Sequence, residues 1–127
     1  MIGKVLRGRD VGGLLRYLYG PGRANEHTDP HLVGSWDDDP AALEPALTTR
    51  GRHDVRGLAG VLEQPLAAVA RCPDRPVWHC AVRVAPGDRR LSDSEWRQVA
   101  ADIVDAGLAH YPATAGSRRR VGYRRLM

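Results

Sequence analysis

Val77-Trp-His-Cys-Ala-Val-Arg-Val84, followed by the turn sequence Ala85-Pro-Gly-Asp88 and then Ser92-Asp-Ser-Glu95, is the stretch that decides the fold. Its apolar side chains alternate with His79, Ala81 and Arg83, which is the period of a β-strand with one apolar and one polar face. Ser92 and Glu95 have the spacing of a helix capping box. We therefore predict a strand, a turn and a capped helix that ends near Gly107.

Weaker signals extend this pattern toward the N-terminus. Ile2 to Leu6 predicts a strand and Arg7 to Asp10 a turn. A short helix follows, with Leu14, Leu15 and Leu18 on one face, and Gly20-Pro21-Gly22 ends it. Residues 23–30 read as a loop.

The middle of the chain is less regular. Residues 31–36 predict a short strand or an extended segment, ahead of the acidic turn at 37–40. Residues 41–71 predict two short helices, with Pro45 and Pro65 at helix starts or kinks. Strands and helices in this order indicate an α+β or α/β protein.

Length and composition narrow the class of protein. A chain of 127 residues supports one hydrophobic core, so we expect a single domain. No apolar run approaches the ~20 residues of a membrane span and no secretory signal opens the chain, so we expect a cytoplasmic protein without a membrane partner. We expect Cys72 and Cys80 to be reduced thiols, with a disulfide as the alternative. No nucleotide-triphosphate phosphate loop, G-x-S-x-G or C-x-x-C motif occurs.

The net charge of +4 is concentrated at the C-terminus. Residues 111–127 contain no acidic residue and five arginines, which are Arg118, Arg119, Arg120, Arg124 and Arg125. Such a tail either contacts a phosphate backbone or is simply solvated, and charge alone does not separate these alternatives.

Three groups of residues could carry chemistry. Tyr17 or Tyr19, at the end of the short helix, could act as a nucleophile, although an aromatic residue there is commonly a packing residue. His27, Asp29 and His31 have an H-x-D-x-H spacing that could bind a metal, with an ordinary surface loop as the alternative. His79 and Arg83 could meet an anion, or could lie on the solvent side of the strand.

Two longer stretches resemble a known family. MIGKVLRGRDVGGLLRYLYGPGRANEHTDPHLV, at residues 1–33, is similar to the opening of actinobacterial plasmid-mobilization relaxases. VWHCAVRVAPGDRRLSDSEWRQVAADIVDAGL, at residues 77–108, resembles a later part of the same family. The similarity covers about residues 1–109, a relaxase-like N-terminal region, and residues 110–127 form a divergent arginine-rich tail.

The resemblance implies an α+β fold, with an incomplete relaxase-like antiparallel sheet and helices packed on one face. It also implies a DNA strand transferase, in which Tyr17 attacks a phosphodiester and becomes joined to the 5′ phosphate. Tyr19 is the reserve, because helix geometry places both phenols at the edge of the apolar face. DNA and other relaxosome proteins are the implied partners, and the DNA contacts would come from Arg16, Arg23, His79, Arg83 and the five tail arginines.

The family also uses a divalent metal, Mg²⁺ or Mn²⁺, held by a histidine cluster of the form H-x-D-x-x-x-H-x-H. This sequence lacks that cluster, since His110 has no partner at the required spacing. We therefore expect a relaxase-related chain that ends before the metal motif and is weakly active or inactive alone. The alternatives are a non-catalytic DNA-binding accessory protein and an inactive remnant with an uncovered sheet edge.

Overall fold

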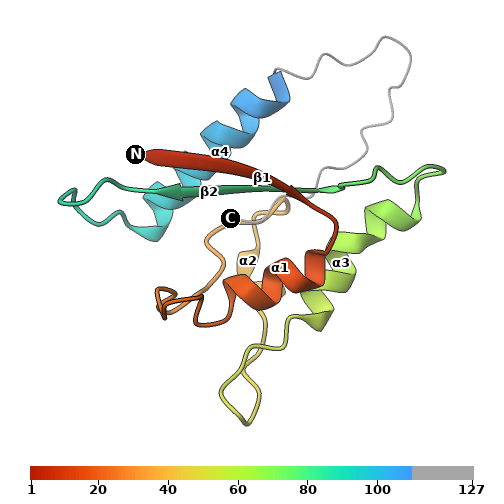
Figure 1. The fold of residues 1–127 in the computed structure, drawn as a ribbon, viewed down its shortest axis with the longest axis horizontal. Helices are drawn as coiled ribbons and strands as arrows, with labels where there is room; N and C mark the ends of the chain where they lie inside the picture. Colours follow the sequence, from red (N-terminus) through yellow and green to blue (C-terminus); the bar gives the residue numbers. More distant parts are fainter. Residues whose placement is uncertain (110–127) are drawn as a thin grey trace. The chain divides into compact units, whose positions relative to one another are not determined.

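The computed structural model describes residues 1–109 and confirms the α+β class (Figure 1). The elements are, in order, β1 (Ile2–Gly8), α1 (Val11–Leu18), α2 (Pro40–Leu43), α3 (Arg56–Ala67), β2 (Val77–Arg83) and α4 (Asp93–Ala109). The chain divides into two compact units, each built from two separate segments. None of the helices in residues 1–109 is both long and apolar enough to cross a bilayer.

The first unit comprises residues 1–31 and 43–89 and contains the only sheet among the described residues. β1 and β2 pair antiparallel, with Ile2 opposite Arg83 and Gly8 opposite Val77. The predicted turn at Arg7 and Gly8 is therefore wrong, because both residues continue β1 and pair with Trp78 and Val77. Pairing with a distant strand, which no local pattern reveals, extends the strand by two positions.

The two-stranded sheet has apolar side chains on both faces. Val5 and Trp78 lie on one face and are 52% and 44% exposed. Ile2 and Leu6 lie on the opposite face and are 48% and 45% exposed. A two-stranded sheet covers little of its own surface, so the predicted division into an apolar and a polar face of β2 is only partly realised.

The core of the first unit lies between α1 and α3. Leu15 of α1 is buried, as are Leu58 and Ala59 of α3 and Val55 just before α3. The two helices expected within residues 41–71 are confirmed as α2 and α3, but they are separated by a tight hairpin. Pro45 lies in the connection after α2, so its predicted place at a helix start or kink is wrong, whereas Pro65 lies inside α3.

The second unit comprises residues 32–42 and the chain from residue 90. Its main element is α4, and the predicted capping box is confirmed: the Glu95 amide donates to Ser92 Oγ at 3.3 Å, and the Ser92 amide donates to Glu95 Oε2 at 2.8 Å. The helix continues through Gly107, so the predicted stop there is wrong. Residues 31–34 have no regular secondary structure, so the predicted strand is not formed there. The Arg97 Nε atom donates to the Val33 carbonyl at 2.6 Å.

Candidate functional site

α1 carries both candidate tyrosines, and its first turn is set by Asp10. The Asp10 carboxylate accepts a hydrogen bond from the Gly13 amide at 2.9 Å, as an N-cap residue does. A side chain at Gly13 would collide with this carboxylate, so glycine is required there. At the other end of the helix, a Cβ atom at Gly20 would lie 2.8 Å from the Arg16 carbonyl oxygen. The glycines therefore allow a short, tightly closed helix.

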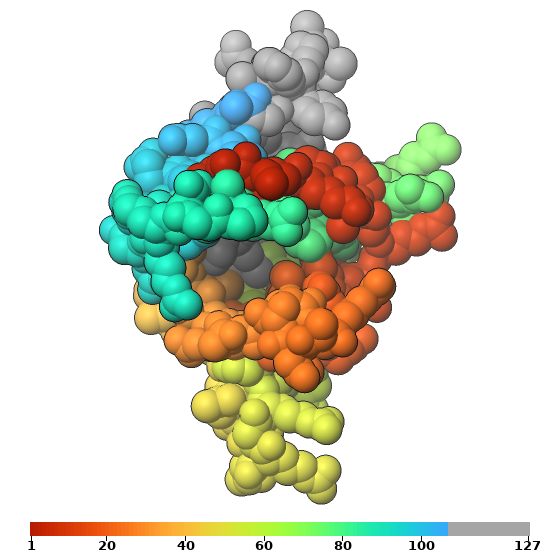
Figure 2. Space-filling model, turned by 60° about the vertical axis from the view of Figure 1, so that its left-hand side comes forward, coloured from red at the N-terminus to blue at the C-terminus, as the bar shows by residue number. Residues whose placement is uncertain are grey.

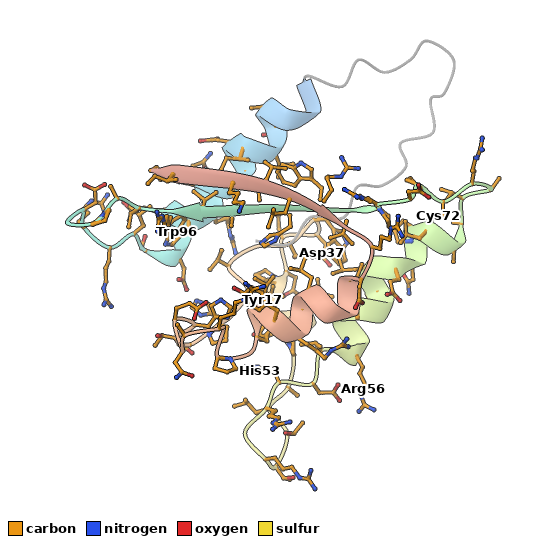
Figure 3. All side chains as sticks on the ribbon, in the orientation of Figure 1. Tyr17, Asp37, His53, Arg56, Cys72 and Trp96 are labelled. Carbon is orange, nitrogen blue, oxygen red and sulfur yellow. The ribbon has the colours of Figure 1, made fainter. Side chains whose placement is uncertain are left out.

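The two tyrosines have different environments. The Tyr17 side chain is 42% exposed, and its ring meets the His27 ring edge to face, with centroids 4.9 Å apart. The Tyr19 hydroxyl is buried, and its ring lies against His53 with centroids 4.8 Å apart. Helix geometry alone does not separate these residues, but their ring partners do, since Tyr17 meets His27 and Tyr19 meets His53. Figure 3 labels Tyr17 and His53.

Tyr19 is poorly suited to be a nucleophile. Burial raises the pKa of its phenol, and the negative charge of the nearby Glu44 carboxylate raises it further. A phenol that resists ionisation, and whose oxygen solvent does not reach, reacts slowly with a phosphodiester. Of the two candidates, the structure therefore favours Tyr17.

The loop after α1 holds His27 against Tyr17. His27 Nδ1 lies 3.0 Å from the Gly20 carbonyl oxygen, and the His27 amide donates to the Pro21 carbonyl at 3.2 Å. Within the loop, the Glu26 carboxylate accepts from the Ala24 amide at 2.6 Å and from the Arg23 amide at 3.3 Å. These bonds, the Ala24 amide first, lower the pKa of Glu26. A neutral His27 that donates from Nδ1 to the carbonyl keeps the lone pair on Nε2.

The described residues do not fit a metal centre. His31 Nδ1 lies 2.7 Å from the Asp29 carbonyl oxygen and 3.8 Å from the Asp29 carboxylate. No group of three or more histidine, cysteine or acidic residues suited to a metal occurs within residues 1–109. The residues of the H-x-D-x-H pattern are therefore not brought together into a metal site. Cys72 and Cys80 are free thiols, as expected.

His79 lies on β2 opposite Leu6 and is partly buried, and this burial lowers its pKa. It is therefore less solvent-facing than the strand pattern predicts, and a neutral imidazole adds no charge to an anion site. Arg83, in contrast, is exposed on the same face of β2, opposite Ile2.

Arg16 and Arg23, the other predicted DNA contacts within residues 1–109, are exposed. The Arg16 guanidinium lies 3.8 Å from the Asp10 carboxylate, and both side chains are about two-thirds or more exposed, at 68% and 72%. Arg23 is exposed in the loop that holds His27. The five tail arginines lie outside the described residues.

Sequence reasoning missed the hairpin between α2 and α3. Leu47 and His53 form an antiparallel bridge, and three arginines, Arg50, Arg52 and Arg56, lie in or beside the connecting loop. Arg56 makes two short hydrogen bonds to Asp54, at 2.9 and 2.7 Å, and these bonds hold the pKa of Asp54 at about 2. The available signal was the Arg50-Gly51 pair inside Thr48-Thr49-Arg50-Gly51-Arg52, which is typical of a turn.

Comparison with known proteins adds no relative. No known protein-family model matches the chain, and no curated protein or solved structure matches it either. The function must therefore be argued from the site geometry and from the sequence resemblance.

Proposed function

We propose that this chain is a relaxase-related DNA-processing protein in which Tyr17 is the residue that becomes joined to a 5′ phosphate. The proposal rests on the different environments of the two tyrosines: Tyr17 is exposed beside His27, whereas the Tyr19 hydroxyl is buried. An accessible phenol next to an imidazole is a usual arrangement for an activated nucleophile.

The proposed step is a transesterification. The Tyr17 phenol oxygen forms a bond to phosphorus, and the bond between phosphorus and the 3′ oxygen breaks. The 3′ oxygen leaves with the bonding electrons and takes up a proton from solvent to become the 3′ hydroxyl. The phenol proton passes to a base. His27 is the imidazole next to the Tyr17 ring, and its Nε2 atom is available because Nδ1 faces the Gly20 carbonyl.

The resemblance implies Mg²⁺ or Mn²⁺ as a cofactor, yet residues 1–109 gather no ligand group for it. We therefore derive no step that uses the metal. A Lewis acid contributes several kcal/mol to such a reaction, so cleavage of an ordinary phosphodiester by this chain alone should be weak or undetectable.

An activated substrate tests Tyr17 without a metal. Single-stranded oligonucleotides with a sulfur atom in place of the 3′ bridging oxygen release a thiolate, which needs no Lewis acid to leave. A pool with randomised flanking sequence should give a covalent protein–DNA adduct, detected by gel shift under denaturing conditions. Tyr17→Phe should abolish this adduct, and Tyr19→Phe should leave it intact. An adduct that persists in Tyr17→Phe would remove Tyr17 from the nucleophile role.

A non-catalytic DNA-binding accessory protein is the second candidate. It is favoured by the missing ligand group within residues 1–109, together with the exposed arginines at positions 16, 23 and 83 and the five arginines of the tail sequence. The side chains of Arg16, Arg23 and Arg83 and the arginines of the tail sequence, whose structure lies outside the described residues, would contact phosphates without reading the bases. Salt-sensitive binding without any adduct, even from the activated oligonucleotides, would select this candidate.

A further inference from the structure

The hairpin between α2 and α3 has a defined backbone. The Thr48 amide donates to the Arg52 carbonyl at 2.7 Å, and the Gly51 amide donates to the Thr48 carbonyl at 2.9 Å. Gly51 has a φ of 71°, the left-handed conformation that ends a three-residue hairpin loop. The Thr48 hydroxyl also accepts from the Arg52 amide at 3.2 Å. The loop Thr49-Arg50-Gly51 is therefore held by its own hydrogen bonds.

The base of the hairpin is fixed to the body of its unit. The Asp54 amide donates to the Ala46 carbonyl at 2.9 Å, and Val55, the next residue, is buried. The His53 ring lies against the ring of Tyr19, whose hydroxyl is buried. The tip protrudes beyond the segment that carries α1, as Figure 2 shows for the yellow part of the chain.

Among residues 1–109, two guanidinium groups at this tip have no acidic partner. Arg50 and Arg52 are exposed, and within residues 1–109 no carboxylate lies within ion-pair distance of either. Arg56, at the base, is already paired with Asp54. An open hollow of about 410 Å³ beside the hairpin is lined by these three arginines together with Thr48, Thr49, His53 and Asp54. Its surface therefore offers cationic and hydroxyl donors for an anion.

We propose that the hairpin at residues 46–54 is a second DNA-contacting element, in which Arg50 and Arg52 bind backbone phosphates of duplex DNA. The inference rests on the proposed function, since it assumes that DNA is the substrate. Proteins that hold single strands usually stack bases on aromatic side chains, and residues 47–52 contain none. Duplex DNA instead presents closely spaced phosphates to protruding cations.

The hairpin would also position the DNA relative to Tyr17. Its base contacts Tyr19, and Tyr17 lies on the same helix two residues earlier. A duplex held at the hairpin would therefore lie at a fixed distance from Tyr17, and the strand to be joined would reach Tyr17 from that duplex.

The test compares two variants of equal net charge. Arg50→Gln with Arg52→Gln removes both tip cations, and Arg71→Gln with Arg75→Gln removes two exposed arginines between α3 and β2. Fluorescence anisotropy with a labelled duplex and a labelled single strand gives the affinity from 0.05 to 0.3 M salt. Two lost phosphate contacts should flatten the slope of log affinity against log salt by about 1.8, which is about a 30-fold weaker duplex affinity near 0.15 M salt. The control variant should keep the wild-type slope.

Several outcomes would overturn the proposal. Equal slopes for the hairpin variant and the control would show that the tip does not contact DNA. A loss confined to the single strand would contradict the choice of duplex. A loss of binding to phosphatidylserine vesicles with unchanged DNA affinity would assign the hairpin to a lipid surface. The adduct assay separates the two proposals. If the protein forms the adduct but the hairpin variant keeps the wild-type salt slope, only the hairpin proposal is rejected. If the hairpin variant has a flattened slope but no adduct forms, only the role of Tyr17 is rejected.

Discussion

Replacing Asp10 by alanine should destabilise α1, the helix that presents Tyr17. This helix has eight residues and includes Gly12 and Gly13, each of which lowers helix stability by about 1 kcal/mol relative to alanine. So short a helix depends on its cap and on packing. The Asp10 carboxylate supplies the cap through the Gly13 amide, and no acidic residue lies in the first turn to compensate for its loss.

The size of the effect follows from the separate roles of Asp10. Loss of the capping hydrogen bond costs about 1 kcal/mol, and loss of the negative charge at the helix N-terminus costs about 0.5 kcal/mol more. The Arg16 contact adds little, because both side chains are largely exposed and 3.8 Å apart. We therefore expect Asp10→Ala to lower the free energy of unfolding by about 1.5 kcal/mol.

Urea denaturation followed by circular dichroism measures this change. Asp10→Asn is the matched control, because it keeps a capping oxygen and removes only the charge, so it should lose about 0.5 kcal/mol. Hydrogen exchange of the amides in residues 13–15 should quicken in the alanine variant more than in the asparagine variant. Equal destabilisation by both substitutions would refute the capping argument and assign the effect to charge. An unchanged alanine variant would refute both.

Two further predictions concern the other unit and the hairpin. Ser92→Ala removes one half of the capping box, so amide exchange in the first turn of α4 should quicken by roughly fivefold, which corresponds to about 1 kcal/mol, whereas Ser92→Thr should keep wild-type protection. Because the folded-state pKa of Asp54 is lowered to about 2, its contribution is complete above the unfolded pKa of about 4 and is lost as the pH falls through 2. Stability to urea should therefore decline between pH 5 and pH 2 more steeply in the wild type than in Asp54→Asn, and parallel declines would contradict this assignment.

Local signals in the sequence predicted the regular elements well. The alternation around Cys80 located β2, and the Ser92 and Glu95 pair located the start of α4, because both patterns depend on neighbouring residues. The extension of β1 through Arg7 and Gly8 was missed, since it depends on pairing with residues about 70 positions away. The hairpin was missed as well, because a single residue pair, Leu47 and His53, forms its bridge and no alternating run marks it.

The sequence identified the candidate residues of the site, but it did not predict how buried each one is or which side chains surround it. Helix geometry gives Tyr17 and Tyr19 equivalent positions, and they differ only in their neighbours from other parts of the chain. Tyr17 meets His27 of the loop after α1, whereas Tyr19 meets His53 and lies near Glu44. A burial difference produced by two separate loops cannot be read from the periodicity of one helix. The same reasoning applies to His79, whose partial burial lowers its pKa although the strand pattern places it on the polar face.

Because of the two Tyr–His pairs, α1 can both attach to the hairpin through Tyr19 and present Tyr17 on its surface. Tyr19 is held by burial and by its contact with His53, so it links α1 to the base of the hairpin. Tyr17 lies two residues earlier, in the last turn of this short helix, and its ring meets His27 instead. Fixing Tyr19 therefore fixes the direction in which Tyr17 is presented. A substitution at Tyr19 that preserves the ring should leave this direction intact, whereas loss of the ring should disturb both the hairpin and Tyr17.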